Sequence, residues 1–457
     1  MFLANRAHPQ AASTLLPGLS FLILLAACGP GDPTKTTDTE TDTGETDTDT
    51  TPPTPDTTAP TVLLPHQGLT AAQLGVVINR DDPLSAEVAA AYVAAHGVPE
   101  ANVVSLPLGL STDLAEADFA VAYAELDAAL PGDVQALLLT FYAPYRVSCM
   151  GAAAAFGLGF DLSYCQDGPP CRSTAPSPYY ANPSALPWTE LGVRPTMMLS
   201  GATLEAAEAV IANGVAAIDS YPGGDVYFIR TTDSARAVRY ADQERTVRRF
   251  DPDEGLAMTY IDASADASAE LLVGTTDVVG YQTGLTYVGS LDTLTFRPGA
   301  LADHLTSYGG VLDGSAGQMP AVDWLTAGAT ASYGTAIEPC NYEEKFPRAT
   351  ELWPAYYTGA TAVEAYWRSV EWPGEGNFVG DPLARPFGTT VTWEAETLTL
   401  DTTQLDRNTA YRVDAADTAD GPWDVVLDGI RGGQDHHRQV IVVPDATRDH
   451  YRLVVDE

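Results

Sequence analysis

Apolar residues between positions 74 and 142 form short continuous runs that alternate with segments of helical spacing. Residues 74–78 are apolar without interruption, as in a strand buried on both faces. After them Asp82 is placed to cap a helix, Pro83 suits its first position, and Gly97 suits the position after its end. The alternation predicts strands at 74–78, 103–106 and 134–142, and helices at 83–96 and 114–130.

Glycine, proline and three cysteines interrupt this alternation over residues 147–195. An irregular stretch of this length inside a compact domain is usually functional or cross-linked. The alternation then resumes. It predicts strands at 196–201, 225–230, 256–261, 277–281 and 328–337, and helices at 203–221, 234–250, 299–306, 319–327 and 359–370.

Most of the chain's arginines lie in the predicted helix at 234–250. On an acidic protein such a group is typical of a solvated helix face that pairs with carboxylates, and we expect that arrangement rather than an anion site. The residues concerned are Arg236, Arg239, Arg245, Arg248 and Arg249.

Strands that alternate with helices predict an α/β fold, with a mainly parallel sheet flanked by helices. From about residue 391 the pattern changes to short alternating strands separated by turns, as in "TVTWEAETLTL". We therefore expect an α/β domain at 62–390, with the Cys-rich insert at 147–195, and a small β-sandwich-like module at 391–457. The first region exceeds the usual size of one domain, so one large sheet and two fused α/β halves both stay open.

The first 28 residues have the pattern of an export signal. The run "LSFLILLAACG" is too short for a membrane-spanning helix, which needs ~20 apolar residues. Its "LAAC" resembles the bacterial lipobox, which implies cleavage before Cys28 and lipidation of Cys28; an ordinary secretory signal is the alternative. Residues 29–61 alternate threonine with acids and close on prolines, so they predict a disordered stalk. We expect an exported protein that contacts a membrane through lipidated Cys28, at the outer membrane or cell surface.

The formal charge of -38 comes from 61 acids against 23 bases. This excess argues against nucleic acid and anionic membrane surfaces as partners, because both need clustered basic residues. The glycine-rich phosphate loops, G-x-S-x-G and H-E-x-x-H are missing, so no cofactor is expected. No metal is expected at His436 and His437, because no third ligand lies at a suitable spacing. A protein, peptide or glycan partner stays open.

Four cysteines remain when Cys28 is set aside. In an exported protein an even number indicates two disulfides, with three possible connectivities. Cys165 and Cys171 flank the turn-forming "QDGPP", so we favour a bond between them and a second bond from Cys149 to Cys340.

Acidic residues near predicted strand ends are candidate binding residues, because open α/β sheets place their ligand crevice there. They suit a cation, a sugar or a peptide. Helix caps and internal ion pairs are the alternative explanation. The candidates are Asp303, Glu338, Glu364 and Asp381.

Two resemblances are carried by residues 277–387. The motifs "GALADHLTS" at 299–307, "GATASYGT" followed by Glu338 and Pro339, and "GDPLARPF" at 380–387 resemble an uncharacterised bacterial family of exported proteins. That resemblance covers about 74–387 and implies no established activity. In addition "GATASYG" and "GDP" resemble the gingipain-like cysteine peptidases, which implies a caspase-like fold. Where that family has its histidine this chain offers Tyr281 or Gln282, and where it has its nucleophile it offers Ser307.

Cysteine peptidase chemistry needs a thiolate and a nearby imidazole. His304 with Cys340, oriented by Asp303 or Glu338, is one arrangement that this chain permits. Ser307 with His304, neighbours at i and i+3 on a predicted helix, is another. We predict a lipid-anchored, non-catalytic binding or structural protein, with Tyr281 and the four acids as candidate binding residues. The alternative is a hydrolase of the peptidase type that uses His304 with Cys340 or Ser307.

Overall fold

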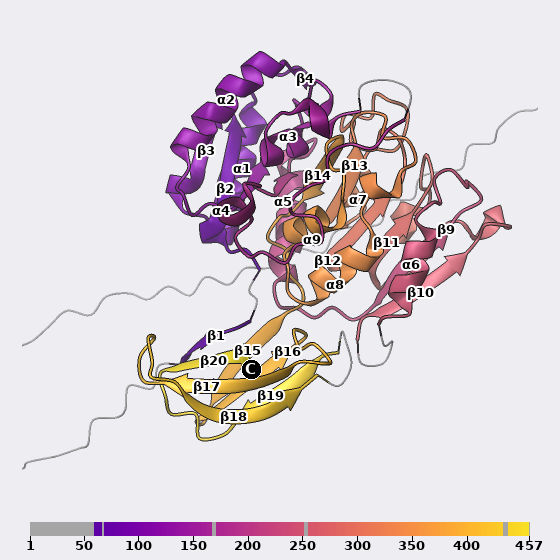
Figure 1. Ribbon diagram of the computed structural model, residues 1–457. Helices are drawn as coiled ribbons and strands as arrows, with labels where there is room; N and C mark the ends of the chain where they lie inside the picture. The colour runs from indigo at the N-terminus through magenta and orange to yellow at the C-terminus, as the bar shows by residue number, and fades with distance from the viewer. Residues whose placement is uncertain (1–58, 66–67, 167–170, 251–254, 433–436, 457) are drawn as a thin grey trace, which may run out of the picture. The chain divides into compact units, whose positions relative to one another are not determined.

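A computed structural model describes residues 59–65, 68–166, 171–250, 255–432 and 437–456 (Figure 1). They belong to one compact unit, Thr58–Glu457. The predicted signal peptide, Cys28, nearly all of the predicted stalk and His436 lie outside the described residues. No helix in the described ranges combines the length and the apolar character that crossing a membrane requires.

A ten-stranded sheet forms the centre of the α/β region, in the order β10-β9-β11-β12-β13-β14-β8-β5-β2-β3. The sheet has two parallel halves, β10-β9-β11-β12-β13 and β8-β5-β2-β3. Between them lies β14, which is antiparallel to β13 and pairs with β8 through one residue pair. This confirms the predicted α/β class. The strands are β2 (Leu74–Asn79), β3 (Val103–Leu106), β5 (Ala136–Leu139), β8 (Thr196–Met198), β9 (Asp225–Arg230), β10 (Ala257–Asp262), β11 (Val278–Thr283), β12 (Phe296–His304), β13 (Ala331–Thr335) and β14 (Gly376–Gly380).

Helices flank this sheet (Figure 1). α1 packs on α5, and α2 meets α3 through an edge-on contact between Phe119 and Phe156. Gly157 of α3 leaves room for the ring of Trp367 in α9, where a Cβ atom would lie 2.4 Å from that ring. The helices are α1 (Pro83–His96), α2 (Glu116–Ala129), α3 (Ala152–Leu158), α4 (Pro187–Leu191), α5 (Leu204–Ala217), α6 (Tyr240–Val247), α7 (Val322–Thr326), α8 (Ala349–Tyr357) and α9 (Ala362–Ser369).

The sheet order reverses at two places. The chain runs outward from β2 to β3 and then returns past β2 to β5 and β8. It likewise runs outward from β9 to β10 and then returns past β9 to β11, β12 and β13. Open α/β sheets bind ligands outside the carboxyl ends of the strands at such reversals. The fold therefore offers two crevices, one in each half.

The first helix forms as its sequence predicts. The Asp82 carboxylate accepts a hydrogen bond from the Leu84 amide, Pro83 takes the first helical position, and Gly97 adopts the left-handed conformation (φ 71°). These features satisfy amide groups that have no partner within the helix and end the helix without strain.

The predicted helix at 299–306 is wrong, because the segment is the end of strand β12. Residues 299–304 are all buried, as in a central strand covered on both faces. Periodicity alone does not separate a short apolar run in such a strand from a buried helix. The predicted helix at 234–250 is also shorter than expected, since α6 begins at Tyr240.

The C-terminal β-module consists of two sheets, in the orders β1-β20-β17-β18 and β15-β16-β19. Their buried side chains, among them Leu398, Val413 and Leu453, form a separate core cluster. The predicted α/β domain begins at residue 62, but β1 (Thr61–Leu63) pairs with β20 of the module. The other strands are β15 (Thr389–Glu394), β16 (Thr397–Thr402), β17 (Ala410–Ala416), β18 (Asp424–Arg431), β19 (Gln439–Val443) and β20 (His450–Val455).

Two disulfides cross-link the Cys-rich insert, but the predicted bonds Cys165–Cys171 and Cys149–Cys340 are wrong. Cys149 bonds to Cys165, and Cys171 bonds to Cys340. A short 3-10 helix, Leu162–Tyr164, places Cys165 beside the turn that carries Cys149, after the short strand β6 (Arg146–Val147). Cys171 is thereby left for Cys340, and the bond between them joins the insert to the segment that follows β13.

Candidate functional site

A groove with two lobes lies beside the Cys171–Cys340 bond, at the carboxyl ends of β12 and β13. The lobes have volumes of about 370 and 360 Å³ and share Cys171, Glu338 and Cys340. We call it the disulfide groove. Its first lobe is completed by Arg146, Gln166, Tyr308, Ala336 and Ile337, and its second by Ala235, Arg236, Leu305, Ser307 and Asn341. Residues 235 and 236 follow β9, so the second lobe extends toward the second reversal of the sheet.

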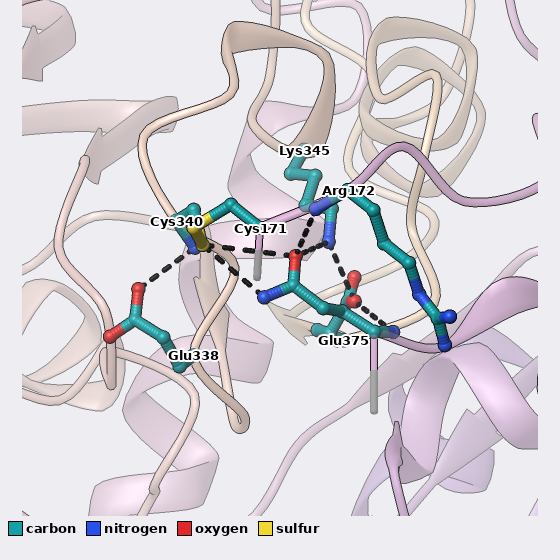
Figure 2. The surroundings of a disulfide bond; sticks show 7 residues. Cys171, Arg172, Glu338, Cys340, Lys345 and Glu375 are labelled. Carbon is teal, nitrogen blue, oxygen red and sulfur yellow. Dashed lines mark hydrogen bonds and ion pairs between the residues drawn. A yellow bond between two sulfur atoms is a disulfide. The ribbon is translucent and has the colours of Figure 1, made fainter. Parts of the chain in front are cut away.

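Glu338 occupies the middle of the groove. Its side chain is half-buried, and one carboxylate oxygen accepts a hydrogen bond from the Cys340 amide at 2.8 Å (Figure 2). This bond closes a tight turn in which Cys340 adopts the left-handed conformation (φ 58°). Burial and the charge of Glu338 raise the pKa of Tyr308. The carboxylate therefore brings a negative charge to a groove that has an arginine in each lobe.

A buried ion pair lies next to the disulfide. The Lys345 ammonium is 2.7 Å from a Glu375 carboxylate oxygen, and both side chains are fully buried (Figure 2). Gln166 links this pair to the bond: its carbonyl accepts from Lys345 at 3.3 Å, and its amide nitrogen donates to the Cys340 sulfur at 3.2 Å. Burial lowers the pKa of Lys345 and raises that of Glu375.

A second buried ion pair joins Arg239 to Asp303 on β12. Asp303 lies 2.6 Å from the Arg239 guanidinium and also accepts from the Gln282 amide at 2.8 Å. Arg239 donates further to the backbone carbonyls of Thr283 and Pro347. The prediction that Arg239 belongs to a solvated face is therefore wrong, because its side chain is only 2 % exposed. Burial raises the pKa of Asp303 despite the nearby guanidinium.

His304 points into the core rather than into the groove. Its Nδ1 accepts a hydrogen bond from the Trp324 indole at 2.9 Å, and the residue is fully buried. Since Nδ1 is an acceptor, the neutral ring carries its proton on Nε2. Burial lowers the pKa of His304 to about 3, and the charge of Arg239 acts in the same direction. The predicted helix on which His304 and Ser307 would be neighbours is absent here.

The buried imidazole predicts an acid-sensitive fold. An unfolded histidine titrates near 6.5 and His304 near 3, so below pH 6.5 the unfolded chain binds a proton that the folded protein does not. The contribution of His304 to stability is complete above 6.5 and declines as the pH falls toward 3. Between pH 7 and pH 5 it should fall by about 2 kcal/mol.

His304→Asn, whose amide oxygen replaces Nδ1 as the acceptor for Trp324, should remove that share of the pH dependence. Urea unfolding at the two pH values measures it, with His450→Asn on β20 as the control. An unchanged slope in His304→Asn would contradict the assignment.

Ser307 and Tyr281 lie in different surroundings. Ser307 lines the second lobe, and its backbone carbonyl accepts a hydrogen bond from the Thr335 hydroxyl at 2.9 Å. Tyr281 is a core residue: its ring meets Trp324 edge-on, and its hydroxyl accepts from the Leu272 amide. Of the candidate residues, the structure brings Ser307, Glu338 and Cys340 together at the groove.

Glu364 and Asp381 have structural partners away from the groove. Glu364 closes the capping box of α9 with Thr361 and also accepts from the Leu69 amide. Asp381 is buried and accepts from the Tyr92 hydroxyl at 3.0 Å, while His96 lies 2.8 Å from its other oxygen. The described residues contain no cluster of three or more potential metal ligands.

Several residues that line or adjoin the disulfide groove could not be recognised as site residues from the sequence. Arg146 lies on the short strand β6, Gln166 lies within the insert, and Tyr308 lies in the loop after β12. Lys345 and Glu375 are 30 positions apart, and no spacing marks them as partners.

Two solved structures align with the chain. One is described as a protease: it is 11% identical, with a TM-score of 0.43 over 85% of this chain and 97% of that chain. The other is the complex of Porphyromonas gingivalis RgpB pro- and mature domains, 10% identical, with a TM-score of 0.34 over 84% of this chain and 99% of that chain. No protein-family model matches, and no curated protein is similar. Identities and TM-scores this low assign no activity to the chain.

Proposed function

We propose that the protein is an exported, lipid-anchored binding protein that holds a short peptide in the disulfide groove without cleaving it. The proposal is supported mainly by the Cys171–Cys340 bond. Cys340 lies beside the candidate acid Glu338, but its sulfur is bonded to Cys171 and is therefore not a free thiol. The described lining residues include no histidine, so Ser307 has no imidazole to activate it. A nucleophile without a base is a poor catalyst.

The charges of the groove favour a zwitterionic ligand. Glu338 lies between the lobes, Arg146 lines one lobe and Arg236 the other. Arg146 pairs with Asp113 and Arg236 with Asp233, but both guanidinium groups keep solvent contact. A peptide ammonium group suits Glu338, and carboxylates suit the arginines. Lobes of this size match the usual range for ligand pockets, ~300–1,000 Å³.

Export and lipid anchoring are supported by the disulfides and by the N-terminal sequence. Two disulfides are typical of proteins from oxidising compartments. The lipobox at Cys28 and the acidic stalk support anchoring to a bacterial envelope. The motifs between 299 and 387 support membership of the uncharacterised exported family, and those at 328–334 and 380–382 support a caspase-like fold. Loss of acyl labelling in Cys28→Ala would test the anchor.

Binding of short peptides should depend on Glu338. A tripeptide library screened by saturation-transfer NMR identifies ligands, and isothermal titration measures them on the oxidised protein. Glu338→Gln should weaken binding about tenfold or more, because the ligand ammonium loses its counter-charge. The matched control is Glu87→Gln, an exposed acid on α1, which should change nothing. Equal affinity in Glu338→Gln, or peptide hydrolysis that Ser307→Ala abolishes, would contradict the proposal.

A further inference from the structure

A second cavity, of about 620 Å³, lies at the first reversal of the sheet. Its walls come from the segments that follow β2, β5 and β8, from the first half of α5, from α7, and from residues 312–313 after β12. We call it the aspartate cavity. Its lining shares no residue with that of the disulfide groove. It occupies the position where open α/β sheets bind ligands.

The lining of the aspartate cavity is apolar and acidic. Leu84, Val210, Leu312 and Leu325 supply aliphatic surface, and further lining comes from Tyr142 and Tyr145. Three aspartates complete it, while no lysine, arginine or histidine is among the described lining residues. A ligand must therefore present apolar surface and no net negative charge.

The three aspartates differ in their partners. Asp82 caps α1 by accepting from the Leu84 amide, and Asp313 accepts from the Ser315 amide. Asp323 is half-buried on α7, and no hydrogen bond or ion pair reaches its carboxylate from the described residues. Burial raises its pKa, and no neighbouring charge opposes this. A carboxylate in this position lacks a counter-ion.

We propose that the aspartate cavity binds a small organic ammonium ion with an apolar or aromatic body, and that Asp323 is its counter-ion. The ammonium group would neutralise the carboxylate, and the rings of Tyr142 and Tyr145 would contact the cation or its body. A neutral ligand leaves Asp323 unpaired, and an anion meets three carboxylates and no base. The proposal is independent of peptide binding in the disulfide groove.

The position of Asp323 in the first turn of α7 has a competing explanation, because a carboxylate there favours the helix. α7 is short, spanning only Val322–Thr326. A purely helix-stabilising role for Asp323 would not require the side chain to line a cavity. The two explanations differ in ligand binding, since a purely structural aspartate would give no selectivity for cations.

The test uses the oxidised full chain and two probes of equal shape. Phenethylammonium and neutral 2-phenylethanol are titrated by NMR, with backbone signals of α5 and α7 as reporters. We expect the ammonium to bind at least about tenfold more tightly than the alcohol, and Asp323→Asn to equalise the two. Glu338→Gln should leave both affinities unchanged, which separates this site from the disulfide groove.

Three results would overturn the inference: equal affinity for the two probes, retention of the preference in Asp323→Asn, or no binding of phenethylammonium up to about 10 mM. Thermal unfolding of Asp323→Asn shows that the variant is folded. Ser315→Ala, which leaves the cavity lining intact, is a second control and should bind like the parent protein.

Discussion

Glu375→Ala is expected to lower the free energy of unfolding by about 3–5 kcal/mol. The reason is that the Lys345 ammonium would remain fully buried without its carboxylate partner. The backbone amide of Gln166 would also lose its acceptor, because it donates to a Glu375 carboxylate oxygen at 2.8 Å. Denaturant unfolding at neutral pH, monitored by tryptophan fluorescence, measures the change.

Two further variants show whether the buried charge causes this loss. Lys345→Met combined with Glu375→Gln removes both charges and keeps an acceptor for Gln166, so most of the stability should return. Glu244→Ala breaks an exposed pair with Arg248 at 3.6 Å and should cost at most about 1 kcal/mol. If Glu375→Ala cost no more than Glu244→Ala, the buried pair would not contribute to stability as expected.

The two disulfides are expected to stabilise the fold unequally. The Cys171–Cys340 bond spans 169 positions, and the Cys149–Cys165 bond spans 16. Loop-closure entropy then predicts losses of about 5 and about 3 kcal/mol when each pair is replaced by alanine. Because Cys171 and Cys340 line both lobes, only their removal should also weaken peptide binding.

Paired Cys→Ala variants tested by urea unfolding and peptide titration measure both effects. The Cys149→Ala, Cys165→Ala protein is the matched control, as neither residue lines the groove. A larger loss of stability or of binding in this control than in the Cys171→Ala, Cys340→Ala protein would contradict the expectation.

Local signals in the sequence were sufficient for much of the α/β core. The strands at 74–78, 103–106 and 225–230 are present, and the cap at Asp82 and the stop at Gly97 set the first helix within its predicted bounds. These elements are specified by neighbouring residues. A strand buried on both faces, such as 299–304, carries no such signal and was predicted as a helix.

Long-range partners could not be predicted. Arg239 looked like part of a solvated face, yet its guanidinium is held by Asp303, 64 positions away. Cys165 and Cys171 looked like partners because they are close in sequence, yet each bonds elsewhere. The partner of a buried cation or of a cysteine depends on which loops the sheet brings together, and spacing along one chain does not report it.

Asn377 links segments that line the two cavities. Asn377, at the start of β14, donates to the Tyr145 carbonyl at 2.7 Å and to the Gly310 carbonyl at 2.9 Å. Tyr145 lines the aspartate cavity, and Arg146 beside it lines the disulfide groove. The fully buried Asn377 thus fixes the segment between the two sites.

We propose that Cys340 forms part of the wall of the disulfide groove and does not act as a nucleophile. A peptide map of the exported protein, alkylated under denaturing and non-reducing conditions, tests it most directly. We predict that Cys171 is linked to Cys340, that Cys149 is linked to Cys165, and that none of the four is alkylated. An alkylated Cys340 in the natively exported protein would show a free thiol at the groove and rule out this structural role.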